Sequence, residues 1–207
     1  MLADLTIKEY LAKTAGNNSV PASGSAAALS AALATSLTEK IANLIAARQE
    51  DVEIKTQMEN IAECMKALRE EFTQCIDRDA DSYNELVEAY KMPEETNEEK
   101  VSRDEQVQKS ILIAAMVPFD VAEMAMRMMD FISDVAKQAD KKTATDVCSA
   151  MCFARSAVVS ALLITKENLL PLKSKQIVQE LTKKSVDIEN SAIAKEQELL
   201  DWFKTQN

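Results

Sequence analysis

The sequence predicts an all-α fold, a multihelical bundle of six to seven helices around a long buried central helix. Only 4% of the 207 residues are aromatic, and there are just two glycines and four prolines, so the composition favours helices over strands. Apolar residues recur at steps of three and four over long stretches, which is the period of a helix face. Because no linker divides the chain, residues 1–207 are expected to form a single helical domain.

The first two helices are predicted on either side of a turn. Residues 5–13 have the pattern of a short amphipathic helix, and the Gly, Asn and Ser residues at 16–19 predict a turn after it. A second, alanine-rich helix is predicted over about 24–48. Ser23 or Ser25 is expected to be its N-cap, because a serine side chain accepts hydrogen bonds from the free amides of a first helical turn.

A third helix is predicted by an apolar seam whose residues are spaced alternately by four and three positions. The seam consists of Ile54, Met58, Ile61, Met65, Leu68, Phe72 and Cys75. Its next two positions are Asp79 and Tyr83, and the apolar pattern resumes at Leu86 and Tyr90. An exposed loop is expected over 91–97, where polar residues surround a proline.

Pro118 divides the next helical pattern. One run of apolar residues starts near Glu98 or Glu99 and stops at Pro118, and a second run continues to about Gln138. A break or kink is expected at Pro118, because proline lacks an amide donor and clashes with the preceding turn. Residues 139–145 are predicted to form a connection to the central helix.

The apolar run 147–163 predicts the central buried helix. Serines and one arginine interrupt it, and it is shorter than the ~20 residues that span a bilayer. Asp146 is expected to be the N-cap of this helix, which reaches about Glu167. Pro171 separates it from a last amphipathic helix over about 174–203.

Net charge and cysteine usage limit the class of protein. The formal charge of −10 argues against a nucleic-acid partner, since no dense run of Lys or Arg offsets it. With no signal peptide and no membrane span predicted, a cytoplasmic protein is expected. The cysteines are then expected to be reduced, buried thiols; they are Cys64, Cys75, Cys148 and Cys152.

The complete absence of histidine limits the possible chemistry. It excludes Ser-His and Cys-His nucleophile pairs and the usual zinc sites. Cys148 and Cys152 lie one helical turn apart, but without a second ligand pair they are interpreted as core residues, and no metal site is predicted. Any acid or base must therefore be Asp, Glu, Lys, Tyr or Cys.

Asp79 interrupts the apolar seam of the third helix. An ionised carboxylate is costly to bury without partners, so a carboxylate at a core position is a candidate functional group. Tyr83 lies one turn further on the same face and can hydrogen-bond to Asp79 or to a shared ligand. The alternative is that the seam opens to solvent here, as the neighbouring Asp77 and Asp81 suggest.

Four other polar residues are candidates on weaker grounds. Arg103 can point into the same interior and bind an anion, or it can be a solvated first-turn arginine. Asp146 can face a cleft as well as cap its helix. Lys166 and Asn168 can line the mouth of a pocket, although polar residues are common at helix ends.

Gly24 stands in a run of small residues at the start of the second helix. With only two glycines in the chain, this one is expected to meet a geometric need. It lets a ligand approach the backbone closely, and the free amides of a helix start favour an anionic group. The alternative is a plain loop followed by a close-packed helix.

Taken in order, these features resemble the cyclodeaminase/cyclohydrolase family, which comprises the C-terminal domain of formiminotransferase-cyclodeaminase and the free-standing methenyltetrahydrofolate cyclohydrolases. The resemblance covers nearly the whole chain and rests on residues 5–11, 21–33, 79–83 and 89–93, Arg103, residues 117–119, Asp146 and residues 161–168. The family's turn has three glycines before its serine, where this chain has Ala22, Ser23 and Gly24. Near the end of the buried helix the family tends to have Asn, Arg and Asn, where this chain has Ile164, Lys166 and Asn168.

The resemblance implies an all-helical subunit that forms a homodimer and binds a tetrahydrofolate derivative, with no metal or redox cofactor. Two reactions follow: hydrolytic opening of the bridge of methenyltetrahydrofolate, or closure of formiminotetrahydrofolate with release of ammonia. The first is preferred because no formiminotransferase domain is attached. Both reactions pass through a tetrahedral carbon between two nitrogens and need proton transfer in a held geometry.

On this interpretation Asp79 is the acid/base group, with Asp146 as the alternative and Tyr83 as a hydrogen-bonding partner. The predicted substrate-binding residues are Ser23, Gly24, Ser25, Lys91, Arg103, Lys166 and Asn168, of which the three cations would attract the anionic glutamate tail. Two further hypotheses stay open: a catalytically weakened relative that binds folate or another small anion, and a helical scaffold protein that oligomerises.

Overall fold

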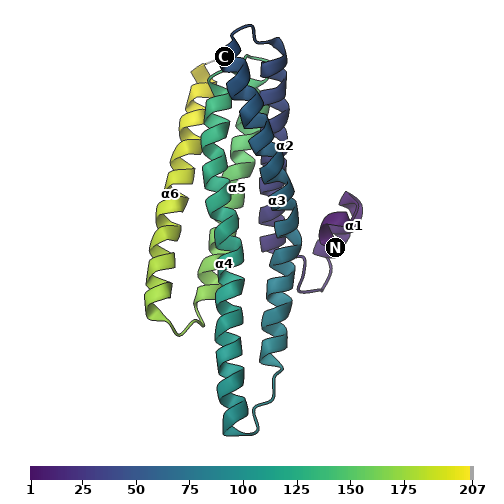
Figure 1. Ribbon diagram of the computed structural model, residues 1–207, viewed down its shortest axis with the longest axis vertical. Helices are drawn as coiled ribbons and strands as arrows, with labels where there is room; N and C mark the ends of the chain where they lie inside the picture. Colours follow the sequence, from purple (N-terminus) through teal and green to yellow (C-terminus); the bar gives the residue numbers. More distant parts are fainter. Residues whose placement is uncertain (206–207) are drawn as a thin grey trace.

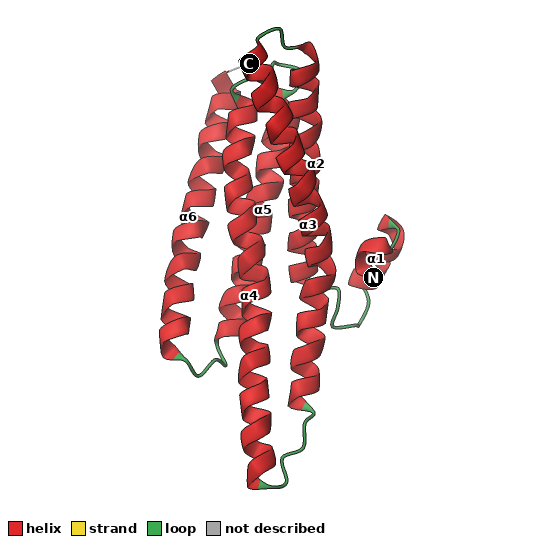
Figure 2. Cartoon of the chain, in the orientation of Figure 1, coloured by secondary structure: helices red, strands yellow, loops and turns green. Residues whose placement is uncertain are grey.

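The computed structural model describes residues 1–205, which contain six α-helices, one short 3-10 helix and no strand (Figure 2). The elements are η1 (Leu2–Asp4), α1 (Ile7–Thr14), α2 (Ser23–Arg48), α3 (Val52–Tyr90), α4 (Asn97–Ala136), α5 (Ala144–Leu169) and α6 (Lys175–Thr205). The all-α prediction is therefore confirmed.

The five long helices form an up-and-down bundle along the long axis of the molecule (Figure 1). Helix α5 packs against α2, α4 and α6, which makes it the central helix that the sequence predicts. The hairpin of α3 and α4 extends beyond the other helices at one end, and α1 lies on the outside beside α2 and α3 (Figure 1). The main core cluster takes residues from all of these helices.

The N-terminal segment is held by its own cap and by an anchor on α3. Thr6 and Glu9 form a capping box at the start of α1. The backbone amides of Leu2 and Ala3 both donate to the carboxylate of Asp77, at 2.5 and 3.2 Å. This anchor fixes η1, and with it the start of α1, against α3.

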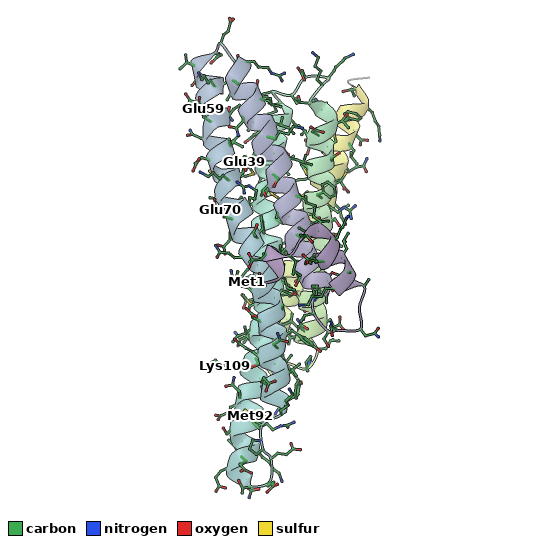
Figure 3. All side chains as sticks on the ribbon, turned by 90° about the vertical axis from the view of Figure 1, so that its right-hand side faces the viewer. Met1, Glu39, Glu59, Glu70, Met92 and Lys109 are labelled. Carbon is green, nitrogen blue, oxygen red and sulfur yellow. The ribbon has the colours of Figure 1, made fainter. Side chains whose placement is uncertain are left out.

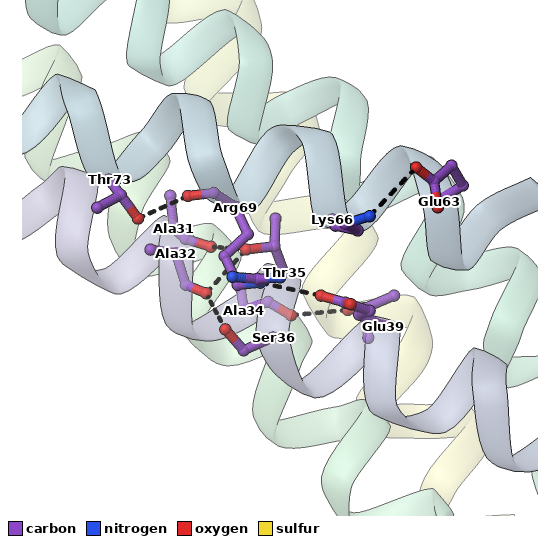
Figure 4. Close-up of polar contacts among 11 residues, drawn as sticks. Ala31, Ala32, Ala34, Thr35, Ser36, Glu39, Glu63, Lys66, Arg69 and Thr73 are labelled. Atoms are coloured by element: carbon purple, nitrogen blue, oxygen red, sulfur yellow. Dashed lines mark hydrogen bonds and ion pairs between the residues drawn. The ribbon is translucent and has the colours of Figure 1, made fainter.

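Helices α2 and α3 pack through the predicted seam. Phe72, Met58 and Met65 are fully buried, and the alanines of α2 face them within one core cluster. At the edge of this interface the Arg69 Nε lies 2.9 Å from a carboxylate oxygen of Glu39 (Figure 4). The seam ends earlier than predicted, because Tyr90 is exposed.

Pro118 does not break α4, so of the break or kink that the sequence predicts, the break is absent. The helix runs without interruption from Asn97 to Ala136 with Pro118 buried inside it. Because proline has no amide hydrogen, the carbonyl of Ala114 loses its helical donor. The side-chain amide of Asn168, from α5, donates to that carbonyl at 2.7 Å instead. Because the Ala114 carbonyl has this donor, the two predicted segments form one helix. Residues 1–205 therefore contain six α-helices rather than seven.

Asp146 is not the N-cap of α5, so that prediction is also wrong. The helix begins at Ala144, and its N-cap residue Thr143 makes no side-chain capping bond. The preceding turn is instead held by Asp140, whose carboxylate accepts from the amides of Lys142 and Thr143, both at 3.0 Å. Asp146 therefore lies within the first turn of the helix.

By length and composition α5 resembles a membrane span, with a mean hydropathy of 1.9 over its most apolar window. Half of that window is buried inside the bundle, and core helices of soluble proteins share this character. Phe153 and Leu163 are nevertheless exposed on its outer side. The structure therefore places α5 as a core helix with one apolar face left uncovered.

All four cysteines are free thiols. Cys75 and Cys148 are buried, and Cys152 is half-buried, as the sequence predicts. Cys64 is exposed, which corrects the prediction that all four are buried. Burial raises the pKa of the Cys75 thiol to about 11, so this group is neutral and unreactive at physiological pH.

Candidate functional site

The candidate site lies where the start of α2 meets the middle of α3. Asp79 is half-buried there, and one of its carboxylate oxygens, Oδ2, lies 3.1 Å from the hydroxyl of Ser25. The same hydroxyl donates to the backbone carbonyl of Ile76 at 2.9 Å. Ser25 is fully buried, and its hydroxyl thus connects the start of α2 to Ile76 and Asp79 of α3.

Gly24 makes room for the Asp79 carboxyl. A Cβ atom built on Gly24 would lie 1.9 Å from Oδ1 of Asp79 and 2.4 Å from its Cγ. These distances are far below van der Waals contact, so any side chain at position 24 would displace the carboxyl. The absence of a side chain at Gly24 therefore allows the Asp79 carboxyl to lie directly on the backbone of α2.

The rest of the turn has no comparable need for glycine. Ala22 is the N-cap of α2, with φ −128° and ψ −159°, and it makes no side-chain capping bond. Within residues 1–205 no residue has a positive φ. Ser23 is exposed and Ser25 lies inside the helix, so the prediction that one of them caps α2 is wrong. Side chains at 22 and 23 fit this backbone without strain.

Burial raises the pKa of the Asp79 carboxyl, while the hydroxyl and the backbone amide of Ser25 act against this rise. The Ser25 hydroxyl has one hydrogen, and its nearer neighbour, the Ile76 carbonyl, can only accept. The two contacts therefore compete for that one hydrogen, and Ser25 donates to Asp79 only when it does not donate to Ile76. A carboxyl whose pKa is raised by burial suits a group that takes up and returns a proton.

Residues 6–187 match a family model described as formiminotransferase-cyclodeaminase. The chain belongs to this family. It is 26% identical over 183 residues to methenyltetrahydrofolate cyclohydrolase of Methylorubrum extorquens, which covers 88% of each chain. It is 24% identical over 135 residues to formimidoyltransferase-cyclodeaminase of Mus musculus, covering 65% of this chain and 25% of that protein.

The family fold is also evident in three dimensions. The crystal structure of formiminotetrahydrofolate cyclodeaminase from Thermotoga maritima superimposes with a TM-score of 0.87 at 18% identity, covering 99% of this chain and 98% of that one. At this identity the likeness concerns the fold. Ala22 and Ser23 stand where the resemblance to the family implies glycines. In this chain only Gly24, the third of these positions, has a close neighbour that a side chain would displace.

Tyr10 is a buried polar residue that the sequence did not indicate as a candidate. It lies on α1, only 8% of its surface is exposed, and its hydroxyl has no hydrogen-bond partner within residues 1–205. Burial and then the charge of Asp79 raise the pKa of this hydroxyl, and the side chain of Thr14 opposes them. No local pattern marks Tyr10, because the groups around it belong to a distant part of the chain.

Tyr83 and Asp146 do not join Asp79 in this family member. Tyr83 lies one turn further along α3, but 41% of its surface is exposed and it makes no hydrogen bond to Asp79. Asp146 forms an ion pair with Lys40 of α2 at 2.8 Å. Lys40 is sixteen positions beyond Gly24, which is about 24 Å along the helix.

The predicted cations are each engaged elsewhere. Lys91 pairs with Glu88 at 2.7 Å, and Arg103 pairs with Glu94 at 2.8 Å while also donating to the carbonyl of Tyr90. Both lie at the end of the α3–α4 hairpin, and Figure 3 shows Met92 of that hairpin well below Met1, which marks the N-terminal segment. The structure thus separates these cations from Asp79.

Lys166 and Asn168 face the neighbouring helices. The Lys166 ammonium lies 2.5 Å from a carboxylate oxygen of Glu189 on α6, and Asn168 supports the proline-containing turn of α4. Of the predicted site residues, the structure therefore brings together Gly24, Ser25 and Asp79, with Ser23 exposed beside them. Within residues 1–205 no group of three or more acidic or cysteine side chains is placed to hold a metal ion.

Proposed function

We propose that this chain is a methenyltetrahydrofolate cyclohydrolase of folate one-carbon metabolism. The relative of that name in Methylorubrum extorquens matches it over 88% of both lengths. The observation that carries the proposal is the Asp79 carboxyl on Gly24, hydrogen-bonded by Ser25, in a protein that has no histidine. A carboxyl with a raised pKa is the acid/base group that the reaction needs.

Asp79 serves in both halves of the reaction. As the oxygen of water bonds to the bridging amidinium carbon, the water gives a proton to the Asp79 carboxylate. As the carbon–nitrogen bond then breaks, protonated Asp79 returns that proton to the nitrogen. The hydroxyl proton of the tetrahedral intermediate leaves as the formyl carbonyl forms, so the cation and one water give formyltetrahydrofolate and one proton. Ser25 stabilises the ionised state of Asp79, because its hydroxyl and its amide both act against the rise in the pKa of that carboxyl.

The remaining site predictions complete this proposal. Tyr83 and Ser23 would contact the ligand from the exposed side of the site, and Asp146 is the alternative proton carrier. The glutamate tail would bind to Lys91, Arg103 or Lys166, with Asn168 beside the last. Since each cation already has a carboxylate partner, tail binding there requires a carboxylate to be displaced, which makes these assignments the most easily tested.

A second candidate is formiminotetrahydrofolate cyclodeaminase. The similarity to the Mus musculus protein and the fold shared with the Thermotoga maritima enzyme favour it, although the chain spans only a quarter of the Mus musculus protein. The same carboxyl would protonate the departing ammonia as the ring closes. A weakened folate-binding relative and a helical scaffold are the further alternatives.

Two assays on the purified protein distinguish these functions. Loss of the ultraviolet absorbance of methenyltetrahydrofolate above the spontaneous rate identifies the cyclohydrolase, and ammonia release from formiminotetrahydrofolate identifies the cyclodeaminase. Folate binding by calorimetry without either turnover would support the weakened relative. Absence of both turnover and binding would contradict the proposed enzyme and leave the scaffold.

The same proposal includes a homodimer in the cytoplasm. On the adjacent helices α2 and α5, Leu33, Phe153 and Leu163 are 47%, 40% and 58% exposed. The Ser30 hydroxyl donates to the carbonyl of Phe153 at 2.9 Å, so these exposed apolar residues lie on two helices in direct contact, and their exposed side is the α2–α5 face. A second copy of the chain is the occupant that we propose for it, since apolar surface of this kind is removed from water by association.

A further inference from the structure

Both ends of the N-terminal segment are held on one turn of α3. At its start the backbone amides of Leu2 and Ala3 donate to the carboxylate of Asp77, at 2.5 and 3.2 Å. At its other end is Ser25, whose hydroxyl lies 2.9 Å from a backbone carbonyl and 3.1 Å from a carboxylate oxygen of the same turn, residues 76–79. The segment is therefore fastened twice beside the proposed proton carrier, which belongs to this turn.

Between these two ends the segment has few polar attachments. Within residues 1–205, the hydrogen bonds and ion pairs that join residues 1–21 to the rest of the protein are only those from the amides of Leu2 and Ala3. The capping box and the other side-chain bonds of α1 are internal to the segment. The Asp77 carboxylate is therefore the one polar attachment of η1 and α1 to the helical bundle.

Apolar contacts add little to this attachment. In η1 and α1 only Leu2 and Tyr10 are buried, whereas Ile7 and Leu11 are 80% and 60% exposed. All residues from 11 to 19 are exposed as well, and α1 lies outside the bundle (Figure 1). A segment with few buried apolar contacts opens at a lower free energy than the core of the same protein, so α1 is expected to open before the long helices do.

We propose that η1 and α1 form a hinged strap beside the candidate site, with the Asp77 carboxylate as its latch. When the two bonds to Asp77 break, the strap swings away from α3 about the exposed turn at 15–19, while Gly24 and Ser25 stay on Asp79 because they belong to α2. A few loop residues can absorb the backbone rotation of such a movement. Latch and proton carrier are two positions apart on α3, so opening widens access to Asp79.

The two parts of this proposal depend on different premises. That the opened strap admits a folate ligand rests on the proposed function. That the Asp77 carboxylate holds the strap closed rests on the hydrogen bonds to Leu2 and Ala3 alone. Each part therefore has its own measurement.

Asp77→Asn weakens the latch without changing its shape. The carboxamide keeps one acceptor oxygen but places an NH2 donor where the second backbone amide donates, so one of the two bonds is lost. Because that bond runs to a charged acceptor, its loss should make opening about tenfold or more frequent. Asp81→Asn is the matched control, since it removes an exposed carboxylate of the same helix.

Hydrogen exchange of the backbone amides, followed by NMR on the folded protein without folate, measures the opening. The amides of Tyr10 and Ala15 are bonded to carbonyls of α1 and its cap, so they report on the strap. Their exchange should be about tenfold or more faster in Asp77→Asn and unchanged in Asp81→Asn, while amides in the middle of α2 keep their rates. Unchanged exchange of both reporters in folded Asp77→Asn overturns the latch.

The wild type alone decides the question if Asp77→Asn does not fold. A strap that opens as one unit gives the amides of Leu2, Ala3 and Tyr10 the same opening free energy, and this value is smaller than that of global unfolding. Exchange of Leu2 and Ala3 at a different opening free energy from Tyr10 contradicts the strap. Exchange of all three only through global unfolding contradicts it as well.

The admission of a ligand is tested by the association rate of formyltetrahydrofolate, the product of the proposed reaction, in stopped-flow mixing. This rate should rise in Asp77→Asn by the same factor as the exchange of Tyr10 and stay unchanged in Asp81→Asn. An unchanged association rate in a variant whose strap opens more often overturns the gating role. Absence of binding to every form of the protein contradicts the proposed function and the gating role together, whereas the exchange result still decides the latch.

Discussion

At the scale of single residues, the distance that matters most is that from Gly24 to Asp79. A Cβ at position 24 would lie 1.9 Å from Oδ1 of Asp79, whereas one at Gly16 would lie 3.2 Å from its nearest neighbour, the carbonyl of Lys13. We expect Gly24→Ala to lower the free energy of unfolding by about 1–3 kcal/mol and to abolish turnover. Gly16→Ala should change stability by less than about 1 kcal/mol. Urea unfolding measures both, and equal effects would contradict the steric argument.

The raised pKa of Asp79 predicts how stability depends on pH. A carboxyl whose folded-state pKa lies above its unfolded value stabilises the fold when protonated, and this contribution is lost as pH rises through the folded pKa. The unfolding free energy of the wild type, relative to that of Asp79→Asn, should therefore be greatest in acid below about pH 3.8 and decline as pH rises toward neutrality. A difference that grows with pH would contradict the dominant effect of burial.

The sequence indicates part of this site but not all of it. Asp79 is visible because it interrupts an apolar seam, and Gly24 because glycine is so rare in the chain. The N-terminal anchor on Asp77 is not visible, since the amides that this carboxylate binds are more than seventy positions away. The sequence leaves open whether Arg103 reaches the interior or is a solvated first-turn residue, and the structure shows it held by Glu94 and the carbonyl of Tyr90 at the hairpin end. Local sequence patterns identify unusual residues, but the packing of the helices determines which of those residues are in contact.

At the scale of whole elements, the pairing of Asn168 with the turn at Pro118 explains why α4 is continuous. We expect Asn168→Ala to lower the free energy of unfolding by about 1–3 kcal/mol, because it leaves the buried Ala114 carbonyl without a donor. In a Pro118→Ala background the restored amide serves that carbonyl, so Asn168→Ala should cost less. A double-mutant cycle measured by urea unfolding tests this, and additive effects would show that the two residues act independently.

The same pair shows what sequence patterns can predict about elements. Periodicity places α3 and its buried seam correctly, because the signal lies within the helix itself. The continuity of α4 at Pro118 depends on the side chain of Asn168, which is 54 positions from the Ala114 carbonyl that it serves. The start of α5 depends on the Asp140 turn rather than on Asp146. The spacing of apolar residues predicts the helices themselves. Whether a helix continues through a proline, or begins without a side-chain cap, depends on contacts outside that helix.

At the scale of the whole molecule, the exposed apolar residues of α2 and α5 form the face on which we propose that the chain dimerises. Leu163→Glu places a charge on that face and should convert the dimer to a monomer with the helical content unchanged. Val186→Glu on α6 is the matched control, because Val186 is also an exposed apolar residue but lies outside this face. Analytical ultracentrifugation measures the outcome. A wild-type monomer, or a dimer that survives Leu163→Glu, would contradict this assignment of the interface.

The role of Asp79 as the proton carrier is tested by the rate at which Asp79→Asn hydrolyses methenyltetrahydrofolate, compared with the wild type and with Asp81→Asn. Asp81 is an exposed carboxylate two positions away on the same helix, so it controls for the loss of one negative charge. We expect Asp79→Asn to lower the rate by about 10²–10⁴-fold and Asp81→Asn to leave it within about twofold. Wild-type hydrolysis above the spontaneous rate that survives Asp79→Asn would contradict the role of Asp79 as the proton carrier.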